Sequence, residues 1–288
     1  MANTIALKRR IVSVKNTKQI TKAMELVSAS KMRRAQEQVQ KSYDYAVLAS
    51  QILTKLRELT DVSEHPLFQN RSIKTKLYLV IASDRGLAGA YNSNVLKRLA
   101  KTLKIDESSG IKAKLIVVGK QTAHFVARLE NVETIAVYTD FVEQPDANDL
   151  RPILNTIIEL YEDKEVDAVD ALFTDYRSSI SQEVTIERML PAAFVEEEVT
   201  PDLDSAIFEP SPQAVLDGVT NRLVESHLSQ VLYESQASEH SMRMMAMKSA
   251  TDNANDLVDD LTLAFNTARQ ASITQELAEI TGGAEAIK

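Results

Sequence analysis

The run 83–89, Ser-Asp-Arg-Gly-Leu-Ala-Gly, is the segment of this sequence whose residue types come nearest to a ligand-binding loop. It lies between an expected strand and an expected helix, where a phosphate-binding loop would sit. Neither Gly-x-Gly-x-x-Gly nor Gly-x-x-x-x-Gly-Lys-Ser/Thr occurs here, and Ser83 and Asp84 serve equally well as turn and cap residues. The run therefore predicts a turn. A nucleotide-dependent enzyme stays open as an alternative, which nucleotide binding by the isolated chain would support.

Other residues with catalytic chemistry do not form a recognisable pattern. The four histidines, His65, His124, His227 and His240, lack a spacing such as His-Glu-x-x-His. The sequence has no cysteine, which excludes disulfides, thiolate metal sites and cysteine nucleophiles. Glu196-Glu197-Glu198 lies between prolines and reads as a solvated connector. We therefore expect no catalytic residue, no metal site and no cofactor.

Basic side chains are concentrated near the N-terminus. Residues 8–41 carry ten of them, among them Lys8, Arg9, Arg10 and Lys15, against two acids, which gives 10 − 2 = +8. Residues 130–210 carry 4 bases and 21 acids, which gives 4 − 21 = −17, while the whole chain has a net charge of −8. Such a basic helix favours an acidic partner, namely nucleic acid, anionic lipid or an acidic protein loop. A solvated helix face explains it equally well, and a DNA-binding coiled-coil protein would show strongly salt-dependent binding.

The basic residues near the N-terminus belong to one of two long stretches that lack helix-breaking residues. Residues 1–65 and 219–281 contain no Gly and no Pro, whereas all seven prolines lie between them. Because Gly and Pro are the strongest helix breakers, each stretch predicts one long helix, which at 1.5 Å per residue reaches roughly 90 Å.

Both stretches show 3-4 spacing typical of a coiled-coil seam. The first seam contains Met32, Ala35, Val39, Ser42, Ala46, Ala49, Leu53, Leu56 and Thr60. The second contains Met247, Ala250, Ala254, Leu257, Leu261, Ala264, Ala268, Ala271, Gln275 and Ala278. Upstream of Met32 the apolar Ile20, Met24 and Val27 lie in a shifted phase, which predicts a stutter. The simplest way to bring the two helices together is an antiparallel pair, and an ordinary helix bundle is the alternative.

The middle of the chain alternates strands and helices. We expect strands at 76–82, 113–118, 133–138, 168–174 and 182–190, and helices at 91–104, 120–128 and 148–163. This order predicts a mostly parallel α/β sheet. The predicted organisation is an N-terminal coiled-coil helix at 1–65, an α/β, Rossmann-like body at 75–205, and a C-terminal coiled-coil helix at 211–281 that pairs with 1–65 and stops near Gly282-Gly283.

Three sequence motifs in the two predicted terminal helices resemble those of a known family. They are Thr-Lys-Gln-Ile-Thr-Lys-Ala-Met-Glu-Leu-Val-Ser-Ala-Ser-Lys-Met at 17–32, Arg-Met-Met-Ala-Met-Lys-Ser-Ala-Thr-Asp-Asn-Ala at 243–254, and Asn-Thr-Ala-Arg-Gln-Ala-Ser-Ile-Thr-Gln-Glu-Leu from 266. Together with the run 83–92 they closely resemble the gamma subunit of the F-type ATP synthase in its bacterial form, over the whole chain and in the right order.

The resemblance implies a central rotor shaft without an active site. In this family the terminal helices form an antiparallel coiled coil inside a ring of three alpha and three beta subunits, and the α/β body meets the epsilon subunit and the c-ring. Proton flow turns the c-ring, and the shaft changes the nucleotide affinities of the beta subunits by differential contact. Neither nucleic acid nor direct membrane contact is implied, and the expected location is peripheral, at the cytoplasmic face of the bacterial membrane.

The resemblance also implies partner-contact residues. Met24 and Arg243 lie where the shaft meets the beta-subunit loops, and Arg269, Gln270, Thr274 and Glu276 lie near the upper bearing. Lys8, Arg9, Arg10 and Lys15 suit an acidic loop of the beta subunits. Leu87 and Tyr91 are candidates for the partner face of the body. The alternative for each is a solvent-exposed position with no partner.

Overall fold

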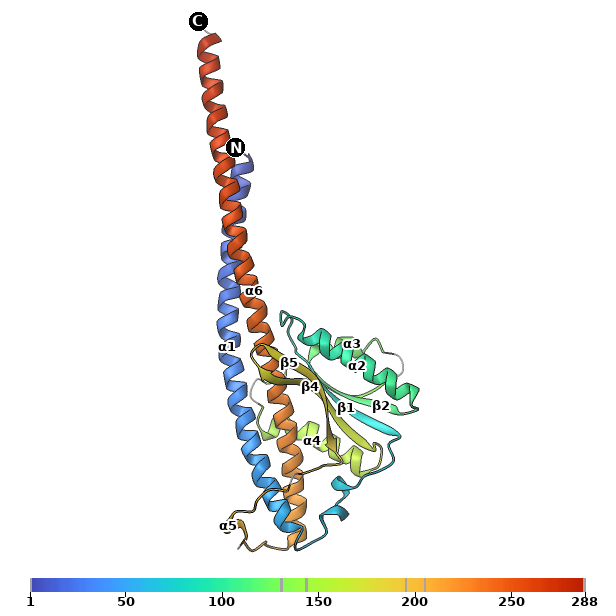
Figure 1. Ribbon diagram of the computed structural model, residues 1–288. Coiled ribbons are helices and arrows are strands. Elements are labelled where there is room, and N and C mark those ends of the chain that lie inside the picture. The colour runs from blue at the N-terminus through green and yellow to red at the C-terminus, as the bar shows by residue number, and fades with distance from the viewer. Residues whose placement is uncertain (1, 130–131, 143–144, 195, 205, 287–288) are drawn as a thin grey trace. The chain divides into compact units, whose positions relative to one another are not determined.

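The computed structural model describes residues 2–129, 132–142, 145–194, 196–204 and 206–286 (Figure 1). Its two longest helices stand at the two ends of the described chain and enclose a five-stranded sheet in sequence. The elements are α1 (Ala2–Leu56), η1 (Val62–Glu64), η2 (Pro66–Phe68), β1 (Thr75–Ile81), α2 (Tyr91–Ser108), β2 (Lys112–Val118), α3 (Lys120–Val126), β3 (Glu133–Tyr138), α4 (Ala147–Glu162), β4 (Ala168–Ser178), β5 (Ser181–Leu190), α5 (Pro201–Asp204) and α6 (Pro212–Ala286).

The chain divides into two compact units, each of which uses part of α1 and part of α6. One unit comprises Met1–Ser28 and Arg243–Lys288, and the other comprises Ala29–Met242. The α/β sheet lies wholly in the second unit.

Helix α1 ends at Leu56 and not near residue 65 as its composition predicted. In the segment that follows, backbone N–H groups donate to side chains of the same segment and do not continue the helix. Asp61 Oδ1 accepts from the backbone N–H of Ser63 at 2.9 Å, and His65 Nδ1 accepts from that of Leu67 at 3.2 Å. Such local bonds compete with helical ones, so a stretch without Gly or Pro can still leave the helix.

Helix α6 passes through Gly282-Gly283 and ends at Ala286, so the predicted stop at the two glycines is wrong. A glycine in a helix interior costs only about 1 kcal/mol, which lowers helix stability without ending the helix.

The sheet has the strand order β3-β2-β1-β4-β5. Strands β1 to β4 are parallel, and β5 runs antiparallel to β4. This confirms the predicted mostly parallel α/β sheet, whose strands lie within a few residues of the expected positions. Gly119 follows β2 at φ 102°, and a Cβ there would lie 2.3 Å from the carbonyl oxygen of Ala82, so no other residue fits without a backbone shift.

Alternating side chains fill a core on each face of the sheet. One core unites Leu79, Ile116 and Phe173 with residues of α4 and with Leu228 of α6. The other places Tyr78 and Val80 against α2 and α3. Since α6 contributes to the first core, this helix is a structural part of the body as well as an arm.

Polar bonds also fasten the body to α6 within the second unit. They come from α2, from the segment before α4 and from the β4–β5 turn. The pairs are Tyr91 Oη with Ser235 Oγ at 2.7 Å, Tyr233 Oη with the Pro145 carbonyl at 2.8 Å, and Ser241 Oγ with the Ser179 carbonyl at 2.8 Å.

The two long helices are antiparallel in both units. In the second unit, Ala49, Leu53 and Leu56 of α1 pack with Leu216 and Leu223 of α6. In the first unit, Thr21 of α1 meets Thr251 of α6. Within the second unit Ser226 Oγ of α6 also donates to the Ser42 carbonyl of α1, so residue numbers there rise along one helix as they fall along the other, which confirms the predicted antiparallel coiled coil.

The seam of α1 does not break upstream of Met32, so the predicted stutter is wrong. Buried or half-buried residues continue the same 3-4 spacing as Leu7, Ile11, Val14, Lys18, Thr21, Glu25 and Ser28. The apolar Ile20 and Val27 are instead 60% and 54% exposed. The heptad is therefore continuous, but polar residues occupy several of its inward positions.

The predicted seam of α6 is correct at Met247, Ala254, Leu261 and Ala268, whereas the predicted Gln275 and Ala278 are exposed. Met247, Ala254 and Leu261 are buried, but Leu257 is 47% exposed. The residues that alternate with the correct ones are Thr251, Val258, Phe265 and Ser272, rather than Ala250, Leu257, Ala264 and Ala271. The predicted and the observed residues are neighbours in sequence and both sets contain apolar side chains, so the sequence pattern did not distinguish them.

Candidate functional site

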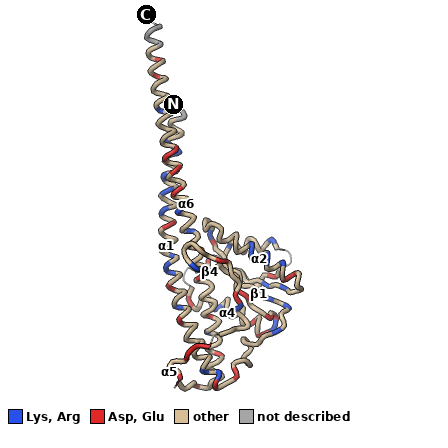
Figure 2. The backbone as a smooth tube through the Cα atoms, in the orientation of Figure 1, with Lys and Arg blue, Asp and Glu red and all other residues tan. Residues whose placement is uncertain are grey.

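The predicted basic contact residues lie on the open surface of α1. Lys8, Arg9, Arg10 and Lys15 are all exposed in the first unit, and Lys and Arg positions, coloured blue, recur along this helix in Figure 2. Two other basic residues between positions 8 and 41 interact within the chain. Lys22 Nζ lies 2.9 Å from Glu25 Oε1, and Lys18 is half-buried at a seam position.

The four candidates near the end of α6 are exposed as well. Arg269 and Glu276 are seven residues apart, and Gln270 and Thr274 are four apart, so each pair shares a helix face. Glu276 Oε1 accepts a 3.5 Å bond from Ser272 Oγ. These side chains are free to reach another molecule, as a partner-contact role requires.

Met24 and Arg243 are less accessible than the other candidates. Met24 is half-buried on α1, and Arg243 is only 8% exposed. An arginine this buried can meet a partner only through a small part of its surface. The structure places both in the first unit, together with the basic residues and the α6 group.

The turn after β1 uses its polar groups internally. Ser83 Oγ donates to the Arg85 carbonyl at 2.6 Å and to Asn92 Oδ1 at 2.9 Å, while Asp84 Oδ1 accepts from the backbone N–H of Lys120 at 3.0 Å. These contacts confirm the turn. Of the two body candidates, Leu87 is exposed with φ 62°, but Tyr91 is 1% exposed and is therefore an internal residue, not a surface contact.

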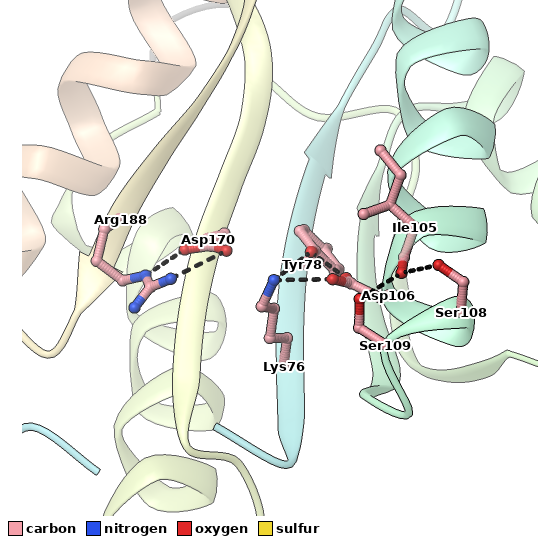
Figure 3. Close-up of polar contacts among 8 residues, drawn as sticks. All are labelled: Lys76, Tyr78, Ile105, Asp106, Ser108, Ser109, Asp170 and Arg188. Carbon is pink, nitrogen blue, oxygen red and sulfur yellow. Dashed lines mark hydrogen bonds and ion pairs between the residues drawn. The ribbon is translucent and has the colours of Figure 1, made fainter. Parts of the chain in front are cut away.

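A row of polar groups crosses one face of the sheet, with Tyr78, Asp106 and Asp170 buried and Arg188 exposed at one end, and sequence reasoning missed it (Figure 3). Asp106 of α2 accepts from Lys76 Nζ at 2.8 Å and also accepts the hydroxyl of Tyr78. Tyr78 is in register with Asp170 of β4, which bonds Arg188 of β5. Burial, and next the bond to Asp106, raise the pKa of Tyr78 far above its ordinary value. The row joins three strands and α2.

The connector between α1 and β1 holds a second unforeseen contact. His65 is buried, and its Nε2 lies 3.4 Å from Asp217 Oδ1 of α6. Because Nδ1 accepts from Leu67 N–H, the proton of the neutral ring sits on Nε2 and points to Asp217. Burial lowers the pKa of His65, against the opposing charges of Asp217 and Glu162.

Comparison with known proteins decides the family. A family model described as ATP synthase matches residues 3–287. ATP synthase gamma chains of Moorella thermoacetica and Acidithiobacillus ferrooxidans are 38% and 39% identical to this chain, with 100% of each chain covered. The chain belongs to the ATP synthase gamma chain family.

Solved structures support the fold of a gamma chain. A central stalk chain of the Tetrahymena thermophila mitochondrial ATP synthase gives a TM-score of 0.62 at 21% identity, covering 80% of this chain and 99% of that one. A chain of the Euglena gracilis mitochondrial ATP synthase gives 0.64 at 18% identity, with 99% and 95% covered. In the part of this gamma chain that the structure describes, every helix is too polar or too short to cross a membrane.

Proposed function

We propose that this chain is the central rotor shaft of an F-type ATP synthase and has no active site of its own. The observation that carries the proposal is its full-length similarity to gamma chains, at 38–39% identity. The antiparallel pair of α1 and α6 supports it, since such a pair suits insertion into a ring of other subunits. In this role the shaft couples proton-driven rotation of the c-ring to the catalytic sites by presenting different contacts to each beta subunit.

The partners that follow are one ring of three alpha and three beta subunits, the epsilon subunit and the c-ring. The shaft would sit peripherally at the cytoplasmic face of the membrane and meet the bilayer only through the complex. The same proposal includes the division of the chain into an N-terminal part at 1–65, whose helix ends at Leu56, a body at 75–205 and a C-terminal helix at 211–281. The two helices enter the ring, and the body faces epsilon and the c-ring.

The contact residues divide into three groups within this proposal. Lys8, Arg9, Arg10 and Lys15 attract the acidic beta-subunit loop, and their exposure supports that role. Arg269, Gln270, Thr274 and Glu276 hydrogen-bond to the upper bearing. Met24 and Arg243 meet the same ring through smaller accessible surfaces.

Native mass spectrometry of the chain co-expressed with its cognate alpha and beta subunits tests the proposal. We expect a complex of three alpha subunits, three beta subunits and one copy of this chain, with ATPase activity that the chain alone lacks. A chain that stays outside the ring, or that binds nucleotide by itself, would contradict it.

The double variant Gln270→Leu, Thr274→Val tests the bearing contacts in the same complex. Because both side chains are exposed, the free chain should keep its melting temperature while ATPase coupling or assembly falls. The exposed pair Asn253→Leu, Thr262→Val, placed elsewhere on α6, serves as the matched control. A melting temperature lowered by many degrees would instead make Gln270 and Thr274 packing residues.

A further inference from the structure

A cavity of about 330 Å³ opens between α1 and α6 in the second unit. Its walls are apolar side chains and one glycine, with Arg222 at the edge. The principal ones are Tyr45, Leu48, Ile52, Val215, Gly218 and Val219. Tyr45 and Leu48 remain about half exposed. Pockets for small organic ligands occupy about 300 to 1,000 Å³ and are mostly apolar, so this cavity has the size and lining of a small one.

Gly218 is an exposed residue that lines this cavity and also a second one, of about 550 Å³, on the side of α4. It lies inside α6, where glycine costs about 1 kcal/mol relative to alanine. No heavy atom lies within 4 Å of the position that a Cβ would take, and the backbone there is not left-handed. Neither a close approach nor a special dihedral angle therefore requires this glycine. Its local effect is to leave space between the two helices.

A further cavity of about 290 Å³ adjoins the first, and the two share Tyr45 and Arg222. This adjoining cavity adds the charged Lys41 and Glu225. Arg222 Nη1 is paired with Glu225 Oε2 at 2.7 Å. Lys41 has no ion pair within the described residues. Among the residues that line these two adjoining cavities, two cations and one carboxylate leave a charge of +1.

We propose that these joined cavities bind a single-chain anionic amphiphile, such as a medium-chain fatty acid. The alkyl chain occupies the space beside Gly218, and the carboxylate pairs with Lys41. The positive balance selects an anionic head over a neutral or cationic one, and the small apolar volume selects one short chain over a two-chain lipid. This site does not depend on the shaft function.

Isothermal titration calorimetry of the full chain with sodium decanoate, below its micelle concentration, tests the site. We expect saturable binding at one site. Gly218→Leu should weaken binding at least tenfold, because leucine fills the cavity. Leucine also favours the helix over glycine, so unfolding would not explain the loss. Asn221→Leu, which adds the same side chain to α6 outside the apolar cavity, should bind as the parent does.

Lys41→Gln tests the head group. This variant should weaken decanoate binding severalfold and leave binding of neutral 1-decanol unchanged. The proposal is overturned by non-saturable decanoate binding, by a Gly218→Leu variant that binds normally, or by equal losses for decanoate and decanol in Lys41→Gln. Capture of the chain by phosphatidylglycerol vesicles without binding of free decanoate would also overturn it, in favour of a membrane surface.

Discussion

At the scale of single residues, Asp106 is the most consequential side chain of the body. It is 3% exposed and is the common acceptor for Lys76 and Tyr78 (Figure 3). A carboxylate buried in this way is stable only while its partners are in place. It therefore fixes the end of α2 against β1.

We expect Asp106→Ala to lower the free energy of unfolding by about 3 kcal/mol, since it leaves a mostly buried ammonium and a buried hydroxyl without their acceptor. Tyr78→Phe, which removes one hydrogen bond, should cost about 1 kcal/mol. Urea denaturation of the full chain measures both. Glu107→Ala, at the exposed neighbour, is the control, and an equal effect of all three substitutions would argue against this role.

His65 predicts a pH dependence of stability. Burial lowers its folded-state pKa below the ordinary value near 6.5, so the unfolded chain binds the proton more readily. The stabilising contribution is complete above pH 6.5 and is lost as pH falls through the lowered pKa. His65→Asn keeps a side-chain acceptor for Leu67 N–H but does not titrate.

Denaturation midpoints measured between pH 8 and pH 5 should therefore fall more steeply for the parent chain than for His65→Asn. The charged groups nearest the ring, Asp217 of α6 and Glu162 of α4, remain in both proteins. Parallel curves would show that other groups control acid stability.

At the scale of elements, the helix pair of the first unit has polar residues at several inward positions and some apolar residues on its outer surface. Thr21 Oγ1 and Thr251 Oγ1 are buried and 2.7 Å apart. Each hydroxyl also has a carbonyl in its own helix, Lys18 for Thr21 and Met247 for Thr251. Polar pairs in a coiled-coil seam typically specify register at some cost in stability.

A double-mutant cycle tests this register contact. Thr21→Val and Thr251→Val should each destabilise the chain by about 1 kcal/mol, since each leaves one buried hydroxyl without its cross-helix partner. The double variant should lose little more than either single variant, because both substitutions remove the same cross-helix bond and each remaining hydroxyl keeps a carbonyl in its own helix. Thermal melting followed by circular dichroism measures the cycle, with exposed Thr17→Val as control. Strictly additive effects would show that the hydroxyls do not interact.

Much of the fold was predictable from periodicity, but the choice between helix faces was not. The positions of the strands follow from apolar runs such as residues 113–118, and the seam of α1 from Met32 onward follows from its 3-4 spacing. The order of the strands within the sheet was not predicted. The inward face before Met32 was missed because Thr21 and Ser28 are buried while Ile20 and Val27 are exposed. Periodicity identifies apolar positions, and it does not tell which of two faces meets the other helix. The contacts of Asp106 with Lys76 and Tyr78, and of His65 with Asp217, join residues far apart in the sequence. No local sequence pattern therefore indicates them.

At the scale of the whole molecule, the charge asymmetry predicts how the chain associates. Lys8, Arg10 and Lys15 are exposed. Replacing all three with Glu should weaken assembly with the alpha/beta ring several-fold at low salt, with a smaller difference at high salt, because exposed charges are screened within about 10 Å at 0.1 M salt.

Co-purification yield and ATPase activity at 50 mM and 500 mM NaCl measure the effect. Lys97→Glu together with Lys101→Glu, on the exposed side of α2, adds acidic charge to the second unit and should leave assembly unchanged. Assembly that is insensitive to the first substitutions at both salt concentrations would reject electrostatic attraction by α1.

The bonds that join the body to α6 also have a mechanical consequence. Tyr91, Ser179 and the carbonyl of Pro145 each bond to α6 from a different segment of the chain. A sideways force on the sheet is thus shared among several short bonds and an apolar core, and no single connection bears it alone. Losing one hydroxyl would soften the attachment, and the body would still turn together with the helix.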